Sequence, residues 1–158
     1  MRNLNLIGLD TTDSLEVAVG LNKLLSNFQI YYQTLRGLQW NIKGNNFFEL
    51  HLKFVELYID AHEKIDLLAE RILTLGQTPH HTFSDYLSNS IIKEGKNISN
   101  GQKGVEFIIE SLKTLLTLER QTLIVANKLE DEGTISLLTD FINLQEKQVW
   151  MFNAWLQS

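Results

Sequence analysis

Hydrophobic residues recur at intervals of three and four along most of the chain, the spacing that places side chains on one face of an α-helix. Four such stripes predict long helices at about residues 12–38, 50–75, 101–130 and 138–155. The polar run that begins at Asp10 offers capping side chains for the first helix, and Gly76 is a typical C-terminal stop for the second. Gly133 is expected to form a sharp turn between the last two.

The connections between these stripes indicate how the helices are arranged. The first and third connections are short, so they join antiparallel neighbours, whereas the second runs from Gly76 to Asn100. Loops longer than ~12–15 residues are uncommon unless they are functional or carry structure, and residues 82–87 have the cap and apolar pair of a short helix. We therefore predict an all-α protein: a ferritin-like four-helix bundle with a short extra helix in the long crossover between helices two and three.

Composition narrows the class of protein further. The 158 residues are 44% hydrophobic and 21% charged, so we expect one domain with a single core over residues 1–158. The net charge of −5 gives no sign of a broad basic surface for nucleic acid. The absence of cysteine excludes disulfides and thiolate metal sites. No apolar run approaches the ~18 residues of a membrane helix, and the N-terminus lacks a signal-peptide pattern, so we expect no membrane contact and a cytoplasmic location.

A ferritin-like bundle suggests a search for di-iron ligands. Within one bundle these need a Glu-x-x-His pair, because residues three apart share a helix face. The chain has four histidines: His51, His62, His80 and His81. The residues three positions before them are, in turn, Phe48, Ile59, Gln77 and Thr78. None is glutamate, so the sequence predicts that the chain has no self-contained di-iron site.

A line of polar residues on the second predicted helix remains as a candidate. It comprises His51, Tyr58, His62, Asp66 and Glu70. Asp66 and Glu70, four residues apart, can both reach one cation, and imidazole with carboxylates suits Fe(II), Mn(II) or Zn(II). His51 precedes Asp66 by fifteen residues, which is about 22 Å of helix. A site that uses all three ligands therefore needs a second chain, whose helix runs antiparallel across a two-fold axis.

A less specific interpretation of the same residues is open at this point. Acidic pairs four residues apart commonly lie on a solvated helix face, and Lys64 or Arg71 could neutralise such a pair here. His62 is expected at a surface or interface rather than on an ion. His80 and His81, beside the only proline, are expected in a polar loop.

The sequence from Gln39 to His51, QWNIKGNNFFELH, followed by DLLAER at residues 66–71, resembles the motif of the Dps family. These are the mini-ferritins, or DNA-binding proteins from starved cells. The run from Val149 to Leu156 is similar to the family's last helix, so the resemblance covers nearly the whole chain. It implies a stress-response protein that forms a homo-oligomeric, dodecameric shell. Such a shell acts as a ferroxidase, oxidising Fe(II), preferably with hydrogen peroxide, and stores ferric mineral inside.

The resemblance also implies a set of metal ligands. Each family site lies at a two-fold interface and takes two histidines from one subunit and an aspartate and a glutamate from its partner. By motif position, His51 is the second histidine, and Asp66 and Glu70 are the carboxylates. Trp40 lies beside the site as a residue that takes up an oxidising equivalent. Gln39 stands where the family has its first histidine.

Two positions depart from the family pattern. An amide oxygen of Gln39 is a weaker ligand for Fe(II) than an imidazole nitrogen, and Val55 replaces an acid that often holds a second, weaker metal. Three interpretations follow. The first is a weakened ferroxidase completed by Gln39, His51 or water; the second is a shell that buffers metal, with zinc possible in place of iron. The third is a non-catalytic shell, or one that assembles with a competent paralogue. We favour the first, because both carboxylates are retained.

Two further expectations concern the surface. Glu130 or Asp131 is predicted to line a route for cations into the shell, because acids near this turn create a negative channel in the family. Direct DNA binding is not expected, because Arg2 is the only basic residue before the first helix. The lysines of the long loop region are expected to be solvated; they are Lys93, Lys96 and Lys103.

Overall fold

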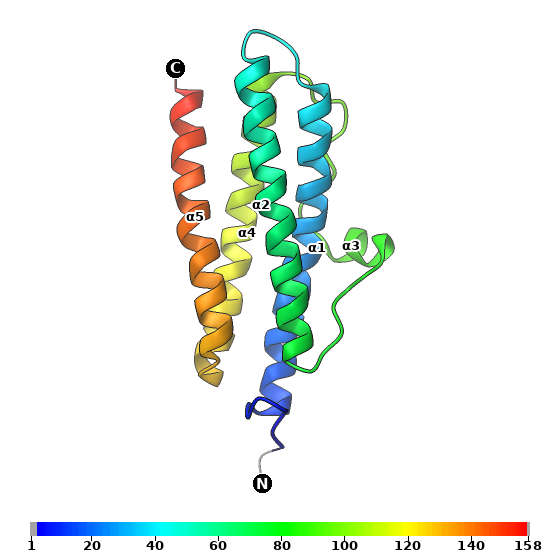
Figure 1. Ribbon diagram of the computed structural model, residues 1–158, viewed down its shortest axis with the longest axis vertical. Helices are drawn as coiled ribbons and strands as arrows, with labels where there is room; N and C mark the ends of the chain where they lie inside the picture. The colour runs from blue at the N-terminus through cyan, green and yellow to red at the C-terminus, as the bar shows by residue number, and fades with distance from the viewer. Residues whose placement is uncertain (1–2, 158) are drawn as a thin grey trace.

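Four long helices lie side by side in the computed structural model, which describes residues 3–157 (Figure 1). They are α1 (Thr11–Asn41), α2 (Phe47–Thr74), α4 (Gly101–Leu129) and α5 (Glu132–Leu156). A short helix, α3 (Phe83–Asn89), lies in the long crossover and packs against α1. The predicted all-α bundle with a short helix between its middle helices is confirmed. Among the helices of residues 3–157, none is both long and apolar enough to cross a membrane.

The core is built from the faces that the hydrophobic stripes indicated. The eight stripe residues of α2 and its C-cap, from Leu50 to Leu75, are all at most 7% exposed. Phe28 of α1 and Phe54 of α2 are among the largest fully buried side chains, and Phe28 packs edge-on against Phe141 of α5 at a centroid distance of 5.9 Å. Burial of each large apolar side chain stabilises the bundle by roughly 1.5–3 kcal/mol.

Helix α1 is buried on more sides than its stripe predicted, because α2, α3 and α4 all pack against it. The stripe predicted from the sequence of this helix comprises Leu15, Ala18, Leu21, Leu25, Phe28, Tyr32 and Leu35. Val17, Leu24 and Tyr31 lie outside it and are at most 2% exposed. Leu15 belongs to the stripe and is 48% exposed. It lies near the N-terminal end of α1, which reaches beyond the ends of α2 and α5 in Figure 1.

The helix ends are formed by the residues that the sequence singled out. The Asp10 carboxylate accepts a hydrogen bond from the Asp13 backbone N–H at 3.0 Å, which caps α1. The Thr82 hydroxyl accepts one from the Asp85 N–H and caps α3. Gly76, with φ of +88°, follows α2 in the left-handed conformation that glycine adopts without steric cost.

The connection between α4 and α5 differs from the prediction. Its left-handed residue is Glu130, with φ of 59°, and Asp131 caps α5, so Gly133 lies inside the first turn of α5. The prediction that Gly133 forms the turn was therefore wrong. Space rather than backbone conformation requires glycine there, because a Cβ atom at Gly133 would lie 2.6 Å from Nη1 of Arg71.

Arg71 fastens the C-terminal part of α2 to this connection. Its Nη2 donates to Oδ1 of Asp131 at 2.6 Å, and its Nε donates to Oγ1 of Thr134 at 3.0 Å. Asp131 is 1% exposed and also accepts from the Thr134 N–H. It is therefore unable to line a route for cations, and that part of the prediction was wrong. Of the two acids predicted for this role, only Glu130 is exposed.

A polar cluster interrupts the apolar core. Glu119 of α4 accepts a hydrogen bond from the side-chain amide of Gln145 on α5, and both residues are at most 1% exposed. Lys64 of α2 is also buried and donates to Asp60 at 2.6 Å, so its charge is already paired. The buried Tyr31 hydroxyl has no hydrogen-bond partner within the described part of the chain.

Burial in this cluster raises the pKa of Glu119 from 4.5 to about 8. Loss of solvation is the largest cause, and the negative charge of Asp60 adds to it. The hydrogen bond from Gln145 and the positive charges of Lys64 and Arg120 act in the opposite direction. The sequence did not predict this buried acid.

Glu119→Gln is expected to stabilise the bundle, increasingly so as the pH rises. The folded-state pKa of Glu119 lies above its unfolded value, so the wild-type stability is fully present below pH 4.5 and is lost as the pH rises through about 8. At ~1.4 kcal/mol per pKa unit, full ionisation costs on the order of 3–5 kcal/mol. Thermal melting at about pH 5.5 and about pH 8.5 measures the effect. Glu16→Gln, at an exposed position of α1, serves as the control, and an equal gain at both pH values would contradict the assignment.

Gly133→Ala is expected to destabilise the protein by about 2–4 kcal/mol. The added methyl group displaces the Arg71 guanidinium and leaves the buried Asp131 carboxylate without its partner. Gly37→Ala in α1 is the matched control, because no atom lies within 4 Å of the Cβ position there. Alanine at Gly37 is expected to stabilise the helix by up to about 1 kcal/mol. Denaturant unfolding compares the two variants, and equal effects would show that Gly133 is not required for space.

Candidate metal centre

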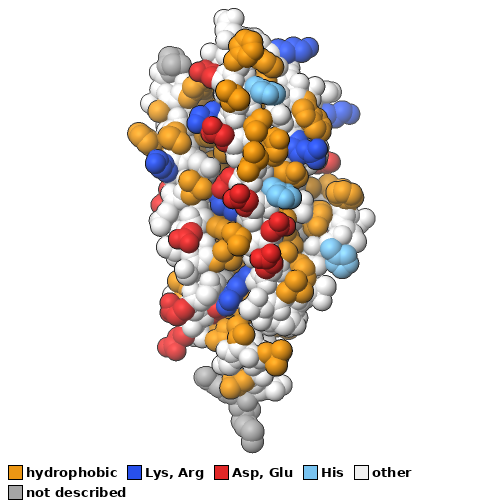
Figure 2. All heavy atoms as spheres, in the orientation of Figure 1, with side chains coloured by type: hydrophobic (Ala, Val, Ile, Leu, Met, Phe, Trp, Pro, Cys, Tyr) orange, Lys and Arg blue, Asp and Glu red, His pale blue; other side chains and the backbone are white. Residues whose placement is uncertain are grey.

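Helix α2 exposes a mixed polar and apolar surface. His62, Asp66 and Glu70 are exposed along it. Large apolar side chains of the same helix are exposed as well: Phe48, Leu52, Ile59, Leu67 and Leu73. Figure 2 shows acidic, histidine and hydrophobic side chains interspersed over the side of the molecule on which α2 lies in front. Contiguous exposed apolar surface rimmed by polar groups is typical of interaction sites in proteins.

His51, near the start of α2, is held through its Nδ1 atom. This atom lies 3.0 Å from the backbone carbonyl oxygen of Gln39, and the imidazole ring stacks on Phe47 with centroids 5.4 Å apart. A carbonyl oxygen only accepts hydrogen bonds, so Nδ1 is the donor in this contact, and in a neutral imidazole Nε2 is then the nitrogen with a lone pair for a metal. Metal-binding imidazoles in proteins are oriented in this way.

Gln39 thus has a backbone role that the sequence did not show. Its carbonyl group orients the imidazole of His51, and so joins the end of α1 to the start of α2 at the candidate site. Every residue type offers such a carbonyl, so no sequence signal could have revealed the contact. The side chain of Gln39 takes no part in this contact. Its identity bears on how strongly the residue would bind Fe(II).

The two cations that could neutralise the candidate carboxylates are paired elsewhere. Lys64 lies 2.6 Å from Asp60, and Arg71 lies 2.6 Å from Asp131. Both pairs are largely shielded from water, with the Lys64 side chain 6% exposed and the Arg71 side chain 18% exposed. The interpretation that Lys64 or Arg71 simply neutralises the acidic pair on α2 was therefore wrong.

The acidic pair itself is accessible. The Asp66 side chain is 65% exposed, and Oδ2 lies 3.9 Å from Nε2 of His62. Within residues 3–157, the Glu70 carboxylate has neither an ion-pair partner nor a hydrogen-bond partner. Both carboxylates are free to accept a cation.

One chain does not assemble the predicted ligand set. Within the described residues, no group of three or more histidine, aspartate or glutamate side chains is placed to hold a metal ion. His51 and Asp66 lie on the same continuous helix, about 22 Å apart along its axis. Their use in one site shared by two chains stays a prediction.

Comparison with known proteins identifies the family. The sequence profile described as "Ferritin-like domain" matches residues 19–158. A DNA protection during starvation protein from Porphyromonas gingivalis is 38% identical over 152 residues, which are 96% of each chain. The chain belongs to the ferritin-like family and is a Dps protein. The resemblance found in the sequence is confirmed.

Crystal structures of other Dps proteins have the same fold. The Dps protein of Vibrio cholerae O1 superposes with a TM-score of 0.96 at 50% identity, over 97% of this chain and 96% of that one. It is described as a member of a broad superfamily of ferritin-like diiron-carboxylate proteins. Dps from Bacillus brevis superposes with a TM-score of 0.89 at 35% identity, over 92% of this chain and 97% of that one. The ferritin-like character of the predicted bundle is thereby confirmed.

Trp40 of this Dps protein lies near the C-terminal end of α1 and is 59% exposed. The guanidinium carbon of Arg36 lies 5.0 Å from the centre of the Trp40 ring and 5.6 Å from that of Tyr32. The cation stabilises both rings electrostatically and makes loss of an electron from either less favourable. The role of Trp40 as a residue that takes up an oxidising equivalent stays a prediction.

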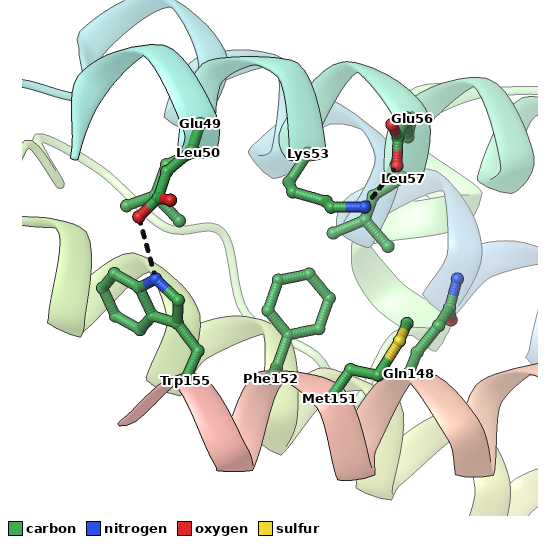
Figure 3. Close-up of a pocket in the computed structure, with 9 residues that line it drawn as sticks. All are labelled: Glu49, Leu50, Lys53, Glu56, Leu57, Gln148, Met151, Phe152 and Trp155. Atoms are coloured by element: carbon green, nitrogen blue, oxygen red, sulfur yellow. Dashed lines mark hydrogen bonds and ion pairs between the residues drawn. The ribbon is translucent and has the colours of Figure 1, made fainter. Parts of the chain in front are cut away.

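A groove between α2 and α5 was not predicted from the sequence (Figure 3). It has a volume of about 230 Å³, and its apolar lining includes Leu50 and Phe152. The indole Nε1 of Trp155 donates across it to Oε1 of Glu49 at 3.1 Å. The other acid of the groove, Glu56, pairs with a lysine at 3.0 Å. Its lining contains two acids and no histidine, and it holds no group of three or more ligand side chains among the described residues.

Proposed function

We propose that this Dps protein is an iron store that binds Fe(II) at sites shared by two chains, oxidises it, and keeps ferric mineral inside a dodecameric shell. The observation that carries the proposal is the set of potential metal ligands on α2. Two carboxylates stand there without a lysine or arginine partner, and an imidazole is held through its Nδ1 atom. Carboxylate oxygen and imidazole nitrogen together suit Fe(II). Iron is the substrate and the cargo of such a site.

A two-fold arrangement of α2 would unite the ligands. When two copies of α2 run antiparallel, His51 of each copy lies opposite Asp66 and Glu70 of the other. Such an interface is self-complementary and creates the same site twice. The exposed apolar residues of α2, among them Phe48, Leu52 and Ile59, would supply its buried surface.

The proposed chemistry balances with hydrogen peroxide as the oxidant. Two Fe(II) ions each give up one electron, the O–O bond breaks, and the two oxygen atoms leave as water after taking up protons. Asp66 and Glu70 would stabilise the additional positive charge that each iron gains, because the carboxylates place negative charge next to the ion. The preference for peroxide rests on the family resemblance.

Gln39 and Val55 favour a weakened site. The first replaces an imidazole ligand by an amide, and the second removes an acid near the proposed second metal position. These two replacements also support an alternative, a Dps-like shell without significant turnover. Such a shell would either buffer metal or bind no metal. Zinc would be the competing metal in such a shell, because imidazole and carboxylate suit it as well.

Paired replacement of Asp66 by Asn and Glu70 by Gln is expected to slow peroxide-dependent Fe(II) oxidation at least about tenfold. Gln39→His is expected to speed it, because an imidazole then occupies the missing ligand position. Formation of Fe(III), followed by absorbance after anaerobic mixing with peroxide, measures both. Glu16→Gln is the control for loss of an exposed acid. If the wild type is as fast as Gln39→His, Gln39 does not weaken the site. If neither oxidises iron, the non-catalytic shell is the better description.

Protection of DNA by this chain is proposed to be indirect, by removal of Fe(II) and peroxide. Phosphate contact needs clustered lysine or arginine, and Arg2, the basic residue of the N-terminal segment, lies outside the described residues. We expect no gel-shift retardation of duplex DNA at low salt and neutral pH. Strong retardation by the wild type would overturn this expectation.

A further inference from the structure

His62 lies one helical turn before Asp66 on the exposed surface of α2. Its Nε2 atom is 3.9 Å from Oδ2 of Asp66, and the two side chains are 61% and 65% exposed. The imidazole also packs against the ring of Tyr32 on α1, with centroids 5.8 Å apart. The ring is therefore placed beside a candidate ligand.

His62 differs from the other histidines, all four of which lie in the described part of the chain. The Nδ1 atoms of the others each have a hydrogen-bonding contact: His51 with the Gln39 carbonyl, His80 with the Ser26 hydroxyl, and His81 with the Pro79 carbonyl. With the described residues 3–157, His62 makes no hydrogen bond through either ring nitrogen, and 3.9 Å to Asp66 is too long for one. Its donor atoms are left available.

The separation of the two side chains is close to that of ligands on one ion. Metal–nitrogen and metal–oxygen bonds of ~2.0–2.2 Å at ligand angles near 90–110° place neighbouring donor atoms about 3.0–3.4 Å apart. From 3.9 Å, a small rotation of either exposed side chain reaches that distance. The spacing of four residues from His62 to Asp66, and again to Glu70, keeps all three side chains along one side of the helix.

We propose that His62 is an additional ligand for Fe(II), which supplies from the carboxylate-bearing chain the imidazole that Gln39 lacks. The inference rests on the proposed function, because His62 and Asp66 do not form a site without Glu70 and a His51 from a second copy. The total of two imidazoles and two carboxylates is then the same as in the family pattern. The summed ligand charge is also the same, so the electrostatic preference for Fe(III) over Fe(II) is retained.

Cobalt(II) binding tests this role without depending on turnover. We expect His62→Ala to weaken binding of Co(II) at least about tenfold and to change its visible absorption, because an imidazole nitrogen is lost from the ion. His81→Ala is the matched control, because His81 lies in an exposed loop and contacts only a nearby carbonyl group. Adding Gln39→His to His62→Ala is expected to restore affinity, by returning an imidazole from the other half of the site.

His62→Gln separates a ligand from a residue that merely positions Asp66. Glutamine retains a hydrogen-bond donor of similar reach, so wild-type Co(II) affinity and absorption in this variant would overturn the ligand role. Wild-type binding in His62→Ala together with loss of binding in Asp66→Asn would also overturn it, and would leave the proposed function standing. Undiminished binding in Asp66→Asn would instead refute the proposed function. Size-exclusion chromatography of each variant excludes misassembly as the cause of a loss.

Discussion

The unbroken course of α2 is the constraint on which the proposed site depends. A helix fixes the axial separation of its residues, and no bending within Phe47–Thr74 brings His51 and Asp66 together. His51 is oriented by a backbone carbonyl, and Asp66 is exposed and pairs with neither Lys64 nor Arg71. A metal site that uses both residues, as proposed, therefore needs a second chain.

The distribution of cations around α2 reinforces this arrangement. Lys64 and Arg71 lie on the same helix as the proposed carboxylate ligands. Each pairs with a different acid, Lys64 with Asp60 and Arg71 with Asp131. The Arg71 pair has two effects at once. It anchors α2 to the start of α5, and it keeps a guanidinium away from Glu70, its neighbour in sequence. The Arg71–Asp131 pair therefore both packs the bundle and preserves negative charge at the candidate site.

Helical periodicity and capping residues were sufficient to predict the bundle. The stripe from Leu50 to Leu75, the caps at Asp10 and Thr82, and the stop at Gly76 all rest on local spacing and local backbone chemistry. Gly133 was misread because its constraint is a contact with a residue sixty-two positions earlier, Arg71. The burial of Asp131 was missed for the same reason.

The candidate site was predictable only in part. The proposed ligand types and the proposed use of two chains rest on residue chemistry and helix length, and the individual roles rest on the family resemblance; these stay predictions. The carbonyl contact of Gln39 and the open donor atoms of His62 depend on three-dimensional placement. The burial of Glu119 could not be predicted from the sequence, because a polar residue next to an apolar stripe has the same spacing whether it faces water or the core.

The distance along α2 also bears on newly synthesised protein. Before pairing, a chain would hold only an incomplete half of each proposed centre, and would bind iron weakly. Oxidation at the proposed sites would then begin only after two chains have joined. The separation of the two ligands along one helix would thus delay reactive iron chemistry until chains have paired.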